Sequence, residues 1–217
     1  AMNKNDSLQI HFLGASGTVT GSKYLLQVPD AAILVDCGLF QGIKKLRELN
    51  WQHLPVKASD IDCVLLTHGH LDHTGYLPRL VKNGFRGAVL GTPPTLDIAE
   101  IILRDSAKIQ EEDAERANRD GFTKHSPAKP LYNTADVEKT LKLFDPQPLE
   151  EWISLGSSAR MRFRYNGHIL GATFIELETS DKLIVFSGDV GRKDDLLLRD
   201  PDRPEKADIL FLESTYG

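Results

Sequence analysis

Short apolar runs bounded by polar turns occur at both ends of this chain, and each has the length of a β-strand. Runs of four to eight such residues between turn signals are typical of strands. In the first third they cover residues 8–13, 23–28, 31–35 and 62–66. In the last third they cover residues 152–155, 159–165, 173–177, 182–186 and 209–212. The pattern predicts two groups of strands separated by a different kind of structure.

The middle of the chain has the spacing of helices. A short helix is expected over residues 75–82, closed by Asn83-Gly84, and a brief strand follows at 88–90. Pro93-Pro94 opens a long helix to about residue 118, whose charged second half is expected to project into solvent. Thr134 is expected to cap a third helix ending at Phe144. Periodicity alone therefore indicates a mixed α and β protein and nothing narrower.

Composition limits the class of protein. The 217 residues, 41% of them hydrophobic, suffice for one large domain with a sizeable core. Apolar runs fall short of the ~20 residues that a membrane span needs, and the amino terminus is too polar for a signal peptide. Cys37 and Cys63 adjoin apolar strands, so we expect buried reduced thiols and a cytoplasmic protein. The net charge of −5 argues against an extended nucleic-acid surface.

The most informative motif directly follows the apolar run at 63–66, and we expect it to form a tight loop at the end of that strand. Thr67-His68-Gly69-His70-Leu71-Asp72-His73 contains four candidate metal ligands within six residues. His68 and His70 can reach one metal together, while Asp72 and His73 can reach a second beside it. Imidazole with carboxylate suits zinc, or iron or manganese in a harder site. A polar surface loop that happens to be rich in His is the alternative interpretation.

Two later segments complete this set. His168 stands in the glycine-flanked turn 166–171, and Asp189 directly follows the apolar strand at 182–186. Each is weak evidence alone, since a turn residue or a helix cap explains it equally well. Combined with the first motif, they predict three imidazoles on one metal, from His68, His70 and His168. Asp72, His73 and Asp189 would hold a second metal, with Asp189 bridging the two.

These motifs resemble the metallo-β-lactamase superfamily, and in particular its β-CASP branch of RNA-processing nucleases, relatives of the cleavage and polyadenylation endonuclease. Four further stretches support the narrower resemblance, and the last is the most specific. They are the opening loop at 14–22, the motif at 34–42 that contains Asp36, the helical stretch at 105–113, and Leu212-Glu213-Ser214-Thr215-Tyr216-Gly217.

The resemblance implies a four-layer αββα sandwich, which would be incomplete here. Residues 1–217 would be the amino-terminal part of the metallo-β-lactamase domain, with Ala1 a remnant of an expression tag. In the branch, a β-CASP domain and a closing segment follow Glu213. They carry a His that acts as an acid and a further His that ligates the second metal. We therefore expect two divalent metals, most simply zinc, with the second held more weakly by this segment.

The implied activity is hydrolysis of phosphodiester bonds in single-stranded RNA, by endonuclease or 5′-to-3′ exonuclease action or both, with a hydroxide shared by the two metals. Asp72 would ligate metal and hold a proton of the nucleophile. Glu213 would orient the absent His. Asp36 would hold a ligand His or the metal-bound water, although it can also simply cap a turn. This segment by itself is expected to cleave RNA poorly.

Two other functions stay open at this point. The fold is known to host hydrolases of thioesters, lactones and lactams, and it does not itself specify the substrate. A non-catalytic scaffold is the second alternative, although every metal-ligand position within the segment is intact. RNA sequence preference, RNA against DNA, metal identity and homo-oligomer formation are all left open by the sequence.

Overall fold

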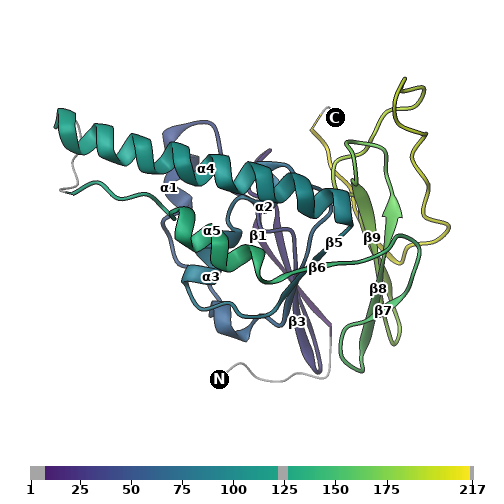
Figure 1. The fold of residues 1–217 in the computed structure, drawn as a ribbon. Helices are drawn as coiled ribbons and strands as arrows, with labels where there is room; N and C mark the ends of the chain where they lie inside the picture. Colours follow the sequence, from purple (N-terminus) through teal and green to yellow (C-terminus); the bar gives the residue numbers. More distant parts are fainter. Residues whose placement is uncertain (1–7, 122–126, 216–217) are drawn as a thin grey trace.

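A computed structural model describes residues 8–121 and 127–215 of the chain. In this part the strands form two sheets that pack face to face (Figure 1). Ala1, His125 and Tyr216-Gly217 of the terminal motif lie outside the described residues.

The first sheet has the strand order β1-β2-β3-β4-β5-β6. Its first three strands are antiparallel, while β3 through β6 pair in parallel. The side chains of β3 alternate between two cores, as the two-residue period of a strand requires. The strands are β1 (Gln9–Gly14), β2 (Lys23–Val28), β3 (Ala31–Val35), β4 (Cys63–Leu65), β5 (Ala88–Gly91) and β6 (Phe144–Pro146).

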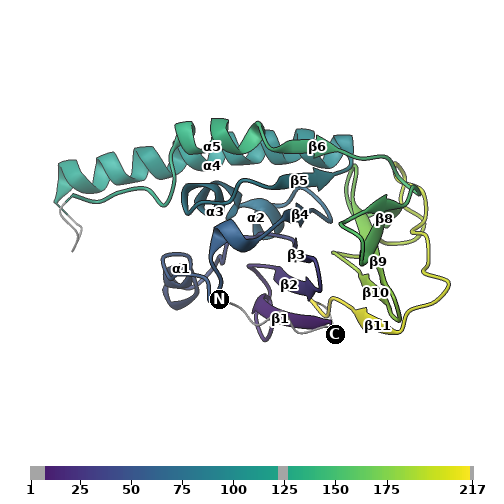
Figure 2. The same ribbon diagram turned by 90° about the horizontal axis from the view of Figure 1, so that it is seen from below.

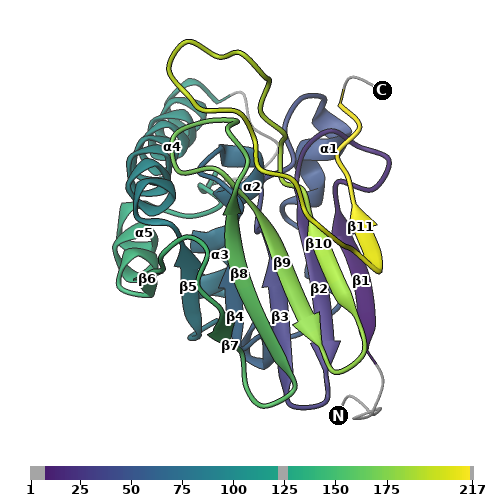
Figure 3. The ribbon, with the colours of Figure 1, turned by 90° about the vertical axis from the view of Figure 1, so that its right-hand side faces the viewer.

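The second sheet has the order β11-β10-β9-β8-β7 (Figure 3). Both β8 and β10 are antiparallel to β9, and β11 is parallel to β10. The carboxyl ends of β8, β10 and β11 therefore lie at the same edge of this sheet. The strands are β7 (Ile153–Ser154), β8 (Ala159–Tyr165), β9 (Thr173–Thr179), β10 (Leu183–Phe186) and β11 (Ile209–Phe211).

Helices cover the other face of the first sheet (Figure 2). One apolar core, which includes Leu34, lies between this sheet and the helices, and a second core, with Ile33 and Val35, lies between the sheets. The helices are α1 (Lys44–Leu49), the 3₁₀ turn η1 (Ala58–Asp60), α2 (Leu71–Thr74), α3 (Leu77–Lys82), α4 (Pro93–Asp120) and α5 (Thr134–Leu141).

The two-sheet sandwich expected from the resemblance is confirmed, and three of its four layers are present in the described residues. The charged end of α4 extends past the sheets, as predicted (Figure 1). No helix of the described residues is both long and apolar enough to cross a bilayer. Cys37 and Cys63 are buried and free, one in each core.

Three local expectations were wrong. Leu71–Thr74 forms a helical turn, where the sequence suggested a loop. The cap of α5 is Asn133, whose side chain accepts from the backbone N–H of Asp136 in a capping box. Phe144 begins β6 beside β5, because that edge of the sheet offers backbone partners that the end of a helix does not have. The short helix α1 was also missed, and it buries none of its residues.

Candidate metal centre

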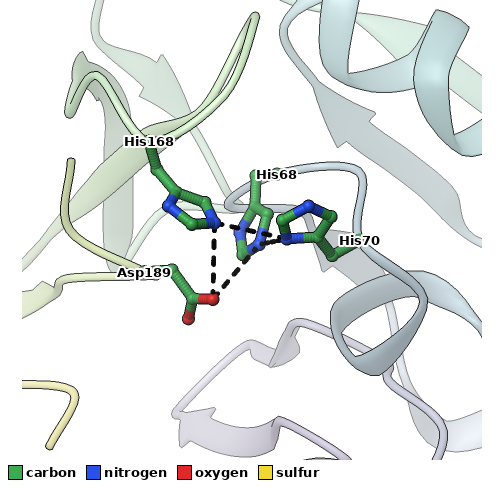
Figure 4. Close-up of side chains that lie close together, drawn as sticks. All are labelled: His68, His70, His168 and Asp189. Atoms are coloured by element: carbon green, nitrogen blue, oxygen red, sulfur yellow. Dashed lines mark hydrogen bonds and ion pairs between the residues drawn. The ribbon is translucent and has the colours of Figure 1, made fainter. Parts of the chain in front are cut away.

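The predicted ligands come together where the carboxyl ends of strands from both sheets meet. The motif 67–73 follows β4, the turn with His168 follows β8, and Asp189 follows β10. Figure 4 shows three imidazoles and one carboxylate pointing toward a common centre. Strand ends of a packed sandwich are rigid, so they hold these side chains in place without long loops.

The first position is defined by four ligand atoms, all within 4.8 Å of one another. His70 Nδ1 lies 3.0 Å from His68 Nε2 and 3.3 Å from His168 Nε2. Asp189 Oδ2 lies 3.7 Å from His68 Nε2 and 3.6 Å from His168 Nε2. The sequence predicted this grouping, and the structure brings these four residues together.

The spacing fits a single tetrahedral ion. Zinc binds imidazole nitrogen at roughly 2.0–2.1 Å, which sets the distance between two ligands of a tetrahedron at about 3.3–3.4 Å. Four of the six distances between the ligand atoms, at 3.0–3.7 Å, lie around that value, and all six are within 4.8 Å. A cation at the centre would also explain why nitrogen atoms of three rings face one another. The donor set of three imidazoles and a carboxylate is one that binds a divalent transition metal.

The second position uses the other oxygen of Asp189. His73 Nε2 lies 3.1 Å from Asp189 Oδ1 and 3.8 Å from Asp72 Oδ2. These three atoms define the second position, which has one imidazole where the first has three. Asp189 faces both positions, one oxygen to each, as a bridging carboxylate does.

A buried network under the two positions orients their imidazoles. His73 Nδ1 donates to Asp36 Oδ2 at 2.7 Å, which leaves Nε2 directed at Asp189. His68 Nδ1 lies 3.0 Å from the hydroxyl of Thr67, which donates to Asp36. In both rings, Nε2 is therefore the nitrogen that is available to bind a metal. The sequence analysis did not identify Thr67 as a site residue. Its position directly before the predicted ligand His68 could have indicated that role.

Asp36 occupies a constrained backbone position, with φ of 57°. It also accepts from the Thr67 backbone N–H at 2.9 Å and from Ser22 Oγ at 3.2 Å. The chain beyond it approaches α2 so closely that a Cβ on Gly38 would lie 1.5 Å from the carbonyl oxygen of Asp72. The carboxylate therefore connects three segments of the site, which is more than a turn cap needs.

Side chains that the sequence did not reveal position the other loops. Asn166 Nδ2 donates to the backbone oxygens of Ser187 and Asp189, at 3.0 and 2.8 Å, which ties the two ligand loops together. The hydroxyls of Thr92 and Thr95 donate to the Gly171 oxygen, at 2.7 and 2.8 Å, and hold the His168 turn against α4. Asn166 and the two threonines are not metal-ligand residue types, so the sequence gave no reason to single them out.

The two groups of imidazoles differ electrostatically. Burial lowers the pKa of His68 well below its usual value, and the neighbouring imidazoles lower it further. Burial alone would also lower the pKa of His73, but Asp36 and Asp189 outweigh that effect and raise it to about 10. Near neutral pH, His68 is therefore a free base, whereas His73 carries a proton that a metal must displace.

Glu213 closes the edge of the site without reaching the ligand cluster. Its carboxylate accepts from the Val190 backbone N–H at 2.5 Å, and its own N–H donates to Ser187 Oγ at 3.0 Å. These contacts attach the terminal motif to the loop that carries Asp189.

The sandwich and its edge site have the architecture of a metallohydrolase, and comparisons identify the family. The Metallo-beta-lactamase superfamily profile matches residues 17–92. Ribonuclease TTHA0252 of Thermus thermophilus is 36% identical over 206 residues, which cover 94% of this chain and 43% of the relative. Cleavage and polyadenylation specificity factor 73 of Drosophila melanogaster is 32% identical over 216 residues, covering 99% of this chain and 29% of the relative.

Transcription termination factor FttA of Methanosarcina mazei is 31% identical over 221 residues, covering 99% of this chain and 32% of that relative. The chain spans less than half the length of these curated relatives. Among solved structures, the metallo-beta-lactamase fold protein YhfI of Bacillus subtilis aligns with a TM-score of 0.51 at 17% identity, over 88% of this chain and 65% of that chain. This chain belongs to the metallo-β-lactamase superfamily, and its ligand cluster is of the kind that binds divalent metal.

Proposed function

We propose that this chain is the metal-binding part of a ribonuclease that hydrolyses phosphodiester bonds of single-stranded RNA with two zinc ions. The observation that carries the proposal is Asp189, whose two oxygens face two separate groups of ligands. A bridging carboxylate of this kind is typical of paired-metal hydrolases that clamp both oxygens of a displacement. The names of the relatives, a ribonuclease and a cleavage and polyadenylation specificity factor, support RNA as the substrate.

When bound, the pair of ions would supply a nucleophilic hydroxide near neutral pH and balance charge on the phosphate. The residues of the chain would bind these ions and orient the groups around them. His68, His70 and His168 would hold the first ion, and Asp72 and His73 the second. Asp36 would keep His73 Nε2 aimed at the centre, through the 2.7 Å hydrogen bond on its other nitrogen. Asp72, beside that imidazole, would also hold a proton of the attacking water.

Zinc is favoured over harder ions because three of the four donors at the first position are imidazoles. Glu213 would position a residue from outside this segment, since its own carboxylate is engaged with Val190 rather than with the ligands. Two free, buried thiols fit a reducing compartment, and we propose the cytoplasm.

The test compares the longer protein that contains this segment with its Asp189→Ala variant on one 5′-labelled single-stranded RNA. Loss of the bridge should abolish cleavage, because both ions depend on it. Asp181→Ala, which changes an exposed carboxylate between β9 and β10, is the matched control and should retain activity. Full activity of Asp189→Ala, or hydrolysis of a thioester probe with no cleavage of RNA, would refute the proposal. The isolated segment should cleave poorly, because the general acid worth about 10²–10⁴-fold in rate is expected outside it.

A further inference from the structure

A pocket of about 280 Å³ opens directly beside the second position and away from the imidazoles of the first. Its floor includes Asp36, His73 and Asp189, and its sides come from the opening loop 15–22 and the terminal segment 211–215. This volume lies just below the ~300–1,000 Å³ of pockets for drug-sized molecules. The pocket therefore suits one small group attached to whatever binds at the metals.

The walls of this pocket are aromatic and its mouth is apolar. The Phe186 and Phe211 rings stack with centroids 4.6 Å apart, and the Tyr24 ring lies 5.5 Å from each. Val19 and Leu212, at the mouth, are 68% and 65% exposed. Large apolar side chains left in solvent at the mouth of a cavity indicate a surface that contacts a ligand.

The charge of the lining restricts the occupant further. Asp36, Asp189 and Glu213 all line the pocket, and no lysine or arginine does so among the described residues. A second phosphate would therefore find none of the lysine or arginine side chains that usually bind it, whereas a neutral planar group does not need them. The hydroxyls of Ser214 and Thr215, at the rim, can bond to the polar edge of such a group.

We propose that this pocket binds the nucleobase of the nucleotide that adjoins the scissile phosphate. The proposal rests on the proposed function, because it places the phosphate at the metals and the base beside them. A single-stranded base can turn out of its stack and lie against aromatic side chains. A neutral base on an aromatic wall, in a space whose described lining has no lysine or arginine, accounts for the size, the polarity and the position of the pocket together.

The test measures four ligands on this chain by calorimetry and by NMR of the Val19 and Leu212 methyl groups. Adenosine should bind and shift both methyl resonances, and ribose should do neither. With zinc present, AMP should bind about tenfold more tightly than ribose 5-phosphate, since base stacking adds to a shared phosphate contact. Equal affinities for AMP and ribose 5-phosphate, or adenosine binding that leaves both methyl groups unshifted, would overturn the proposal, as would no binding of adenosine.

Two exposed substitutions separate the pocket from general effects on folding. The double variant Val19→Ser and Leu212→Ser should weaken adenosine binding about three- to tenfold and leave ribose 5-phosphate unchanged. Leu196→Ser removes an apolar side chain that is 96% exposed and lies outside the pocket lining, so it should change neither. Equal weakening by both changes would refute the assignment. If adenosine binds but ribose 5-phosphate does not bind the zinc-loaded chain, the proposed metal site is wrong and the pocket stands.

Discussion

The two positions of the candidate centre share Asp189 and differ in almost everything else. The first position has three imidazoles from two loops and ligand atoms spaced as around one ion. The second has one imidazole and two carboxylate oxygens, spaced at 3.1 and 3.8 Å from that imidazole. The first is therefore complete in the described residues. The second position shares a bridging carboxylate with the first, but its three ligand atoms are too few to surround an ion.

The two positions also differ in the protonation of their imidazoles. Nδ1 of His68 is hydrogen-bonded to the neutral hydroxyl of Thr67, while Nδ1 of His73 is hydrogen-bonded to the carboxylate of Asp36. The neutral partner leaves an imidazole ready for metal, whereas the charged partner stabilises imidazolium until a metal displaces the proton. The same buried network therefore contacts one imidazole that is neutral near pH 7 and one that is protonated there.

Removal of the shared ligand should have the largest effect. Asp189→Ala should lower the zinc affinity of both positions, because each loses one oxygen and the first loses its only anionic ligand. Metal analysis after gel filtration should then find less than one ion per chain. Asp72→Ala provides the contrast, since it should empty only the second position. If both variants lose the same amount of metal, Asp189 does not bridge.

Dialysis of the unmodified chain against a mild chelator should remove one of two zinc ions. The first position encloses its ion with four protein ligands, and the second leaves part of the shell to water. Elemental analysis at increasing chelator concentration measures the two losses. Retention of two ions per chain to the end of the series would show that the positions are equivalent.

Asp36→Asn should weaken zinc about 10–100-fold at the second position, the usual loss when the partner of a ligand His is changed. Asn tolerates the positive φ at this site, so the variant should fold. The effect at the first position should be smaller, because Asp36 reaches His68 only through Thr67. Competition with a coloured chelator gives both constants. A larger loss at the first position would reverse our assignment of the network.

A change of pH tests the protonation of the two imidazoles directly. Below its folded pKa of about 10, His73 must release a proton to bind metal, so zinc affinity at the second position should rise about tenfold per pH unit from 7 to 9. His68 is already neutral there, so the first position should change little. Calorimetry in buffers of different ionisation enthalpy counts the protons released. Release of one proton on binding at the first position and none at the second would contradict the predicted protonation of His68 and His73.

Much of the fold could be predicted from the chain because strand and ligand signals are local. Residues 23–28, 31–35 and 159–165 were expected as strands and are strands with those bounds. The errors occur where distant partners decide: Phe144 joins a sheet because β5 offers an open edge, and Leu71–Thr74 forms a helical turn whose backbone oxygens accept from residues 22, 37 and 39. Asn166 and Thr92 could not be recognised as site residues either, because their hydrogen-bond partners lie far away in the sequence.

The amino-acid sequence by itself determined which side chains have metal-binding chemistry and that they follow strands, since both are properties of residue type and short-range periodicity. Only the tertiary structure decided that the two oxygens of Asp189 face different imidazoles. It also decided that burial and neighbouring imidazoles lower the pKa of His68, while Asp36 and Asp189 raise that of His73. Those outcomes depend on burial and on distances between segments more than 30 residues apart, such as the 37 between Asp36 and His73. Electrostatic interactions in a buried site act across space rather than along the chain.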